Sequence, residues 1–111
     1  MNKIVLITGA TAGIGKACAI KFAAEKFDVI ITGRRNERLL QLKTKLEKEY
    51  AVEVLTLCFD VQDKHAVANA ISNLPQRWQK IDTLINNAGL ALGRDSFEDA
   101  DMNDWETMLN S

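Results

Sequence analysis

Three glycines fall within seven residues near the start of the chain, in the stretch Thr8–Gly15. The preceding run, Ile4–Ile7, is continuous, apolar and rich in β-branched residues, which is typical of a short strand buried on both faces. The residues that follow have the apolar spacing of a helix, so the glycines lie in a strand-to-helix turn. Such a turn can direct backbone N–H groups and the positive end of a helix dipole at an anion, and glycine lets a phosphate come close. The pattern predicts phosphate binding, with a plain tight turn as the alternative.

The spacing of these glycines is Gly-x3-Gly-x-Gly, which differs from the commoner dinucleotide pattern Gly-x-Gly-x2-Gly. A glycine cluster alone is weakly specific, so other stretches must decide between the two interpretations. For the helix after the turn, we expect a buried stripe formed by Ile14, Cys18 and Phe22, with Ala17 beside it.

Length and charge exclude several classes of function. A chain of 111 residues forms one domain at most. The net charge of −1, from 14 basic and 15 acidic residues, gives no general attraction to nucleic acid or to an acidic membrane. Only a short apolar run precedes Gly9, too short for a signal-peptide core or a membrane span, so we expect a cytoplasmic protein.

The potential metal ligands are few and scattered. Cys18 and Cys58 have no Cys-x-x-Cys spacing, and His65 is the only histidine. We expect both cysteines to be buried as small apolar residues, and no metal site. Basic residues gather between Arg34 and Lys48, but glutamates are interleaved with them, which favours a solvated helix face.

Strand-like and helix-like segments alternate along the rest of the chain. Strands are predicted at residues 28–32, 52–58 and 81–85. A helix at residues 36–50 is predicted from the apolar face formed by Leu39, Leu42, Leu46 and Tyr50. A second helix, ended by Pro75, is predicted from Val67, Ile71 and Leu74. A third helix, with Asp101 as its N-cap, is predicted from Trp105, Met108 and Leu109. This alternation predicts an α/β fold made of βαβ units, in which a doubly wound parallel sheet carries helices on both faces.

Ligands of such sheets bind beyond the carboxyl ends of the strands, where the strand order reverses. The residues with functional chemistry do follow strands: the glycine turn, Gly33-Arg34-Arg35, Asp60-Val61 and Asn86-Asn87-Ala88-Gly89.

The segment after the second strand predicts the choice of cofactor. An NAD site commonly places an acidic residue there to bind the ribose 2′-hydroxyl, whereas arginine suits the 2′-phosphate of NADP. Residues 32–36 contain no carboxylate, and Arg34 and Arg35 are in the expected place. The sequence therefore predicts NADP, with Arg38 as a weaker candidate contact. The alternative is that both arginines are surface residues before a helix.

Taken together, these motifs resemble the N-terminal half of a short-chain dehydrogenase/reductase. The resemblance rests on Thr8-Gly9-x3-Gly13-x-Gly15, Asp60-Val61 and Asn86–Gly89, and it covers the whole chain. It implies a Rossmann-type fold. The stretches Gly33–Leu39 and Asp104–Met108 are more closely similar to bacterial NADP-dependent 3-hydroxy acid dehydrogenases, whose members oxidise serine, L-allo-threonine or small 3-hydroxy acids.

The resemblance also implies roles for individual residues. Gly9, Gly13 and Gly15 would shape the pyrophosphate turn, with main chain from Ile14 and a hydroxyl from Thr11. At the adenine end of the nucleotide, Asp60 would accept a hydrogen bond from the adenine amino group and Val61 would pack on the adenine ring. At the other end, the nicotinamide-side ribose would be lined by Asn87, Ala88 and Gly89. For Asp60 the alternative is a helix cap, a role for which Asp63 is better placed. For Asn87–Gly89 the alternative is a plain strand-ending turn.

The family's catalytic tyrosine, lysine, serine and asparagine cannot be assigned. Tyr50 has Glu53 where the lysine belongs and lies on an amphipathic helix, where packing explains it better. Asn110 comes two positions too early for the asparagine. We therefore expect residues 1–111 to be the N-terminal part of one NADP-binding domain, inactive alone, with the catalytic half missing.

Three functions use a nucleotide-binding half-fold of this kind. The first is an NADP-dependent oxidoreductase that, at full length, acts on the hydroxyl of a small 3-hydroxy acid or hydroxy amino acid, as a homo-dimer or tetramer. The second is a non-catalytic NADP-binding sensor. The third, a sugar-nucleotide epimerase or dehydratase, is disfavoured because those relatives usually carry Gly-x2-Gly-x2-Gly and lack Asn-Asn-Ala-Gly.

Overall fold

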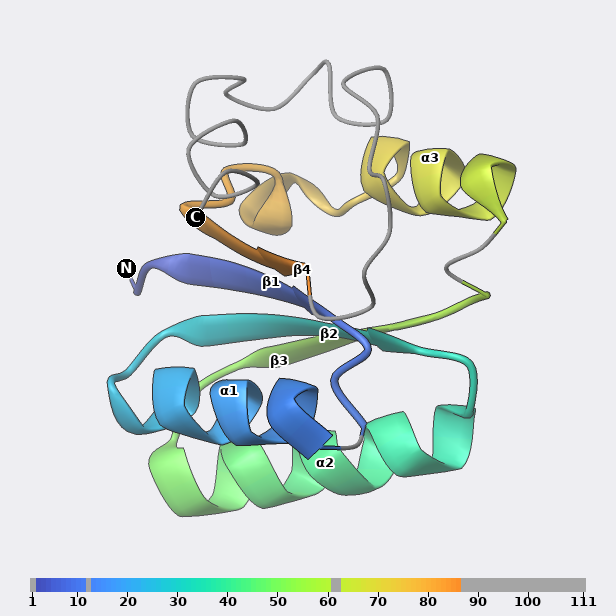
Figure 1. Cartoon of the computed structure of the whole chain (residues 1–111). Helices are drawn as coiled ribbons and strands as arrows, with labels where there is room; N and C mark the ends of the chain where they lie inside the picture. Colours follow the sequence, from blue (N-terminus) through green and yellow to red (C-terminus); the bar gives the residue numbers. More distant parts are fainter. Residues whose placement is uncertain (1, 12, 61–62, 87–111) are drawn as a thin grey trace.

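A computed structural model describes residues 2–11, 13–60 and 63–86 of the chain. Strands and helices alternate in this part, as the sequence predicted (Figure 1). The elements are β1 (Ile4–Thr8), α1 (Gly13–Ala24), β2 (Asp28–Gly33), α2 (Asn36–Tyr50), β3 (Val54–Cys58), α3 (Lys64–Ser72), the short 3-10 helix η1 (Gln76–Trp78) and β4 (Thr83–Asn86).

The four strands form one parallel sheet in the order β3-β2-β1-β4. The chain proceeds outward from β1 to β3 and then crosses back to place β4 on the other side of β1. This is the order of the first four strands of the Rossmann-type fold, and the reversal lies between the carboxyl ends of β1 and β4. The predicted α/β architecture is confirmed.

Helices cover both faces of the sheet: α1 and α2 lie on one face, and α3 with η1 lies on the other (Figure 1). Alternate residues of β1 and β2 supply the two cores, so both strands are buried along their whole length. On α2, Leu39, Leu42 and Leu46 are buried and Tyr50 packs partly buried against them, as predicted. The packing role of Tyr50 is thereby confirmed.

The predicted buried stripe of α1 is wrong by about one residue. Gly15, Ala19 and Ala23 face the sheet, whereas Ile14 is 73% exposed and Ala17 is exposed. Small residues recurring every fourth position let the helix lie close to the strands, so its larger side chains are displaced to the edges of the contact. Cys18 and Phe22 are half-buried there, and the Phe22 ring meets Phe27 edge-on at 4.9 Å.

Other expectations need smaller corrections. Cys58 is exposed and Cys18 only half-buried, so the prediction that both are buried is wrong. The last strands begin later than expected, at Val54 and Thr83. Helix α3 ends at Ser72 rather than at Pro75, because the chain leaves the helix at Asn73, and Leu74 is buried beyond its end. The predicted helix near Trp105, with its cap Asp101, lies outside the described residues.

Asp28 holds the amino end of the sheet together. Its buried carboxylate accepts hydrogen bonds from the Glu53 amide (2.9 Å), from Asn2 Nδ2 (3.2 Å) and from the Arg77 guanidinium (2.6 Å). Arg77 also pairs with Glu53 and lies over the Trp78 ring. Burial by itself raises the pKa of the Asp28 carboxyl, but the Glu53 amide, Arg77 and Asn2 together outweigh burial and hold that pKa below its ordinary value.

Within the described ranges, none of the helices combines the length and the apolar character needed to cross a membrane.

Candidate functional site

The glycine turn joins β1 to the first turn of α1 at the carboxyl edge of the sheet. Gly9 and Gly13 have φ values of +61° and +57°, a conformation that side chains other than glycine rarely adopt. A Cβ atom placed on Gly13 would meet nothing within 4 Å, so the turn is open on that side. The first turn of α1 contains no acidic residue that would compete for its N–H groups. This geometry suits an incoming anion.

Two contacts hold the turn against β2 and α2. The Ala10 amide donates to the Thr32 carbonyl oxygen at 3.1 Å. Gly33 allows the second contact, since a Cβ there would lie 3.2 Å from the Thr11 methyl group and 3.3 Å from Leu39. Glycine at the end of β2 therefore lets Thr11 sit directly beside the start of α2.

A side-chain contact joins the two strands that flank the reversal of strand order. Thr8, the last residue of β1, donates from Oγ1 to Oδ1 of Asn86, the last residue of β4, at 3.1 Å. This pair was not predicted from the sequence. The available signal was that Thr8 and Asn86 directly follow the predicted strands at residues 4–7 and 81–85, which the Rossmann-type strand order places side by side.

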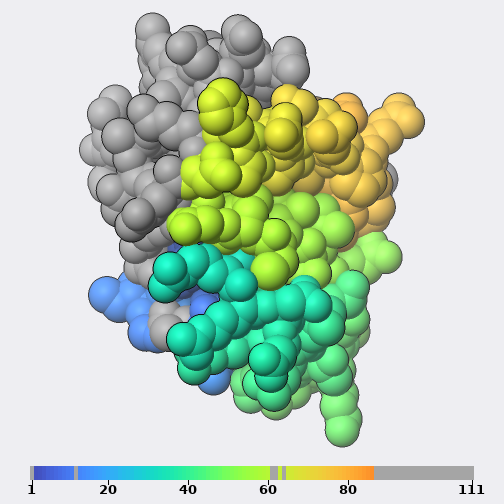
Figure 2. Space-filling model, turned by 90° about the vertical axis from the view of Figure 1, so that its right-hand side faces the viewer, coloured from blue at the N-terminus to red at the C-terminus, as the bar shows by residue number. Residues whose placement is uncertain are grey.

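Arg34 and Arg35 follow β2 at the same edge, and both are exposed. Arg35 is the N-cap residue of α2, but its side chain makes no capping hydrogen bond. Within the described part of the chain, neither guanidinium forms an ion pair. Figure 2 views the molecule from this edge, where the start of α2 lies between the segment after β3 and the start of α1. Both arginines are therefore available to an anionic ligand.

Asp60 and Asp63 have separate positions after β3. Asp63 is the N-cap of α3, and its Oδ1 accepts from the amides of His65 (3.0 Å) and Ala66 (3.2 Å). The expectation that Asp63 is the better cap is confirmed. Asp60 is exposed, and its carbonyl oxygen accepts from the Asp63 amide at 2.9 Å. The assignment of Asp60 to adenine stays a prediction. Val61, Asn87, Ala88 and Gly89 lie outside the described residues.

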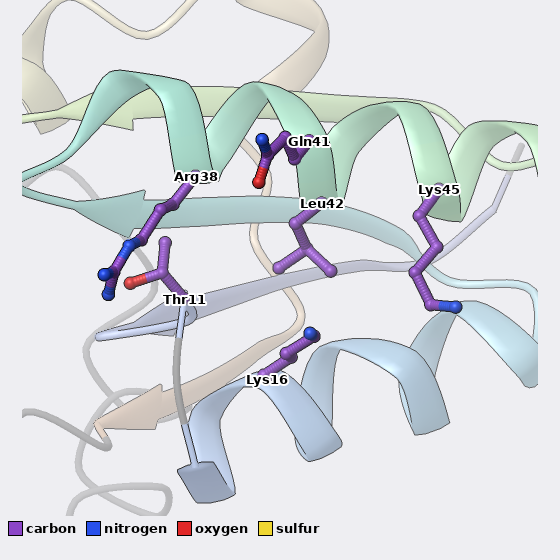
Figure 3. A pocket seen from close by; sticks show the side chains of 6 residues that line it. All are labelled: Thr11, Lys16, Arg38, Gln41, Leu42 and Lys45. Carbon is purple, nitrogen blue, oxygen red and sulfur yellow. The ribbon is translucent and has the colours of Figure 1, made fainter.

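A recess of about 270 Å³ lies between α1 and α2. Figure 3 shows Arg38 beside Thr11 at one end, Lys45 at the other, and Lys16 reaching in from α1. The lining residues are Thr11, Lys16, Arg38, Gln41, Leu42 and Lys45. Of these residues, Thr11 and Arg38 were predicted as site residues from the sequence, whereas Lys16, Gln41 and Lys45 were not. The spacing of positions 38, 41, 42 and 45, three or four residues apart, places them on one face of α2.

No group of histidine, cysteine and acidic side chains in the described ranges is arranged to hold a metal ion. What the edge offers is a positive-φ glycine turn, a helix N-terminus and several cations. These features favour a ligand with more than one phosphate group.

The chain is similar to known proteins along its whole length. The family model described as short chain dehydrogenase matches residues 3–111. Sulfoacetaldehyde reductase 2 of Chromohalobacter salexigens is 46% identical over 111 residues, which are 100% of this chain and 43% of that protein. An NADP-dependent 3-hydroxy acid dehydrogenase of Salmonella typhi is 46% identical over 97% of this chain and 42% of its own length. The chain thus spans less than half the length of these relatives.

Solved structures agree in fold. Serine dehydrogenase of Escherichia coli has a TM-score of 0.67 at 43% identity, over 96% of this chain and 48% of that one. L-sorbose reductase of Gluconobacter frateurii, in complex with NADPH and L-sorbose, has a TM-score of 0.74 at 31% identity, over 80% of this chain and 34% of that one.

Proposed function

This chain belongs to the short-chain dehydrogenase family, and we propose that it forms the NADP-binding part of an oxidoreductase that acts on the hydroxyl of a small 3-hydroxy acid or hydroxy amino acid. One observation carries the proposal. The exposed guanidinium groups of Arg34 and Arg35 follow β2 directly, at the edge where the glycine turn opens, and residues 32–36 include no carboxylate.

NADP would accept or supply the hydride, and the residues of this chain would bind and orient it. The N–H groups at Gly13, Ile14 and Gly15 point toward a pyrophosphate in this proposal. Arg34 and Arg35 select the 2′-phosphate through charge-assisted, often bidentate hydrogen bonds. Arg38 joins them, because it shares a recess with Thr11 of the turn.

The remaining assignments extend the same nucleotide along the edge. Asp60 accepts a hydrogen bond from the adenine amino group and Val61 packs on the ring. The stretch Asn87–Gly89 lines the nicotinamide-side ribose. The strand order supports this proposal, because β3 lies beside β2 and β4 lies beside β1, so the carboxyl ends of β3 and β4 are on opposite sides of β1.

The substrate class follows from the names of the relatives and from their chemistry. The relatives are named for a 3-hydroxy acid, for serine and for sulfoacetaldehyde. Each is a small molecule that carries a carboxylate or sulfonate near a hydroxyl or carbonyl carbon. We propose a substrate of that kind, handled by residues beyond the described part of the chain in a cytoplasmic homo-dimer or tetramer.

The test uses the protein at its full natural length. L-Serine, L-allo-threonine and 3-hydroxypropionate are offered with NADP or NAD, and sulfoacetaldehyde with NADPH or NADH, while the absorbance of the reduced nicotinamide is followed. We expect turnover with NADP or NADPH and one of these substrates. Tight NADP binding without turnover of any of them would instead support the non-catalytic sensor. Equal use of NAD would refute the assignment of Arg34 and Arg35.

A further inference from the structure

The recess between α1 and α2 gathers positive charge from two helices. Lys16 comes from α1, whereas Arg38 and Lys45 come from α2, and no carboxylate is among the lining residues (Figure 3). Within the described ranges, neither Lys16 nor Arg38 forms an ion pair. Lys45 pairs with Glu49 at 3.1 Å, but both side chains are more than 40% exposed, so water screens that pair.

The arrangement matches an anion with several charges. Arg38 and Lys45 are seven residues apart, so their backbones lie about 10 Å apart along the helix. Because the cations are spread along this length of helix, an anion with linked phosphoryl groups can contact more of them than a single phosphate group can. The Gln41 amide, between these cations, adds a neutral donor. The volume of about 270 Å³ suits a small ligand of this kind.

The recess also opens at the cofactor edge. Arg38, which is assigned above to the 2′-phosphate, lines one end of the recess beside Thr11 of the glycine turn, whereas Lys45 lies at the far end (Figure 3). A ligand that occupies the whole recess therefore uses the Arg38 guanidinium, which the 2′-phosphate also uses in the proposed function. Two ligands that share a contact oppose each other's binding reciprocally.

We propose that the recess binds a small polyphosphate anion through Lys16, Arg38 and Lys45, in competition with the 2′-phosphate of NADP for Arg38. The competition rests on the proposed function. The binding of the anion does not. The shared chemistry belongs both to inorganic pyrophosphate and to the phosphate tail of a nucleoside triphosphate.

Direct titration of the full-length protein tests the anion site. Inorganic pyrophosphate is titrated by calorimetry into the wild type and into K16Q, K45Q and K43Q. Lys43 is the matched control, because it is on α2 and pairs with Glu47 but does not line the recess. We expect K16Q and K45Q each to weaken pyrophosphate binding about fivefold or more, since each removes one charge-assisted contact, and K43Q to leave it unchanged.

Two outcomes of this titration refute the anion site: no binding of pyrophosphate, or equal binding by wild type and K45Q. ATP is the second probe. Binding of ATP that is tighter than that of pyrophosphate and depends equally on Lys45 identifies a nucleotide as the ligand. Equal affinity identifies the free anion.

Cofactor titration tests the competition. The Kd values of NADP and NAD are measured with and without pyrophosphate at constant ionic strength, so that general screening is held fixed. We expect pyrophosphate to raise the Kd of NADP severalfold in the wild type, to affect NAD little, and to act weakly in K45Q. Equal weakening of NADP and NAD would refute the competition, because it would locate the anion at the glycine turn. Lack of preference for NADP without pyrophosphate would refute the proposed function and leave the direct titration unaffected.

Discussion

Replacement of Asp28 by asparagine is expected to destabilise the protein substantially. Asparagine keeps the shape, and its oxygen can still accept from the Glu53 amide and Asn2, which both contact Oδ1. The amide nitrogen then replaces Oδ2, which lies 2.6 Å from the Arg77 guanidinium. A charge-assisted hydrogen bond is lost, and two donors face each other beside a buried strand.

The magnitude follows from burial. The Asp28 side chain is 3% exposed, but that of Arg77 is 40% exposed, so the arginine can turn toward water and recover part of the loss. A hydrogen bond to a charged group contributes about 1.5 to 3 kcal/mol, and we expect D28N to lower the free energy of unfolding by about 2 kcal/mol. R77Q should cost about 1 kcal/mol, because it leaves Asp28 with two donors.

Urea denaturation of D28N, R77Q and the double variant, followed by circular dichroism, measures these differences. The double-mutant cycle should give a coupling of about 1 kcal/mol between the two side chains. D82N is the control: Asp82 accepts from the Ile4 amide at 2.9 Å but is exposed, so asparagine should change stability by less than about 0.5 kcal/mol. A cost of D28N no larger than that of D82N would refute the reasoning.

The contribution of Asp28 to the free energy of unfolding should decrease at acidic pH. The native-state pKa of Asp28 is lowered, so its stabilising contribution is present above the unfolded-state pKa of about 3.9 and is lost as pH falls through the native value. The difference in unfolding free energy between wild type and D28N should therefore be constant near neutral pH and shrink below about pH 4. A difference that grows on acidification would contradict the assigned direction.

Three further substitutions probe the carboxyl edge. Replacing Arg34 and Arg35 together by glutamine should weaken NADP binding about tenfold or more and leave NAD binding nearly unchanged, as measured by fluorescence titration. Gly13→Ala should cost about 1 kcal/mol in urea denaturation, because φ is +57° there while the space for a methyl group is open, and it should weaken both cofactors alike. Asp63→Ala should cost about 1 kcal/mol through loss of the α3 cap, with no change in the ratio of NADP to NAD affinity.

The sequence predicted the elements whose signals are local. Continuous apolar runs revealed β1 and β2, because strands buried on both faces leave no polar alternation. The leucine spacing of α2 predicted its buried face, and the position of Asp63 predicted a cap. In each case the residue type and its neighbours in sequence contain the whole signal.

The sequence could not reveal how closely two elements approach. The orientation of α1 was mispredicted because Ile14 and Phe22 were preferred over Ala19 and Ala23 as buried residues, whereas the short distance between helix and sheet selects the small ones. The recess was missed for the same reason. Its cations come from α1 and α2, and only the packing of the two helices brings them together.

The two ends of β2 have different roles: the amino end contributes to the stability of the fold, and the carboxyl end is the one proposed to bind the cofactor. At the amino end, the Asp28 carboxylate is buried and satisfied by Arg77 and its other donors, so its charge is compensated within the protein. At the carboxyl end, Arg34 and Arg35 are exposed and form no ion pair in the described ranges, so their charges can pair with an anionic ligand. The ends are separated by the length of a six-residue strand, about 17 Å from first to last Cα. That distance exceeds the Debye length at physiological salt, about 8 Å. D28N should therefore change the free energy of unfolding and leave the NADP to NAD affinity ratio intact, and the arginine variants should do the reverse.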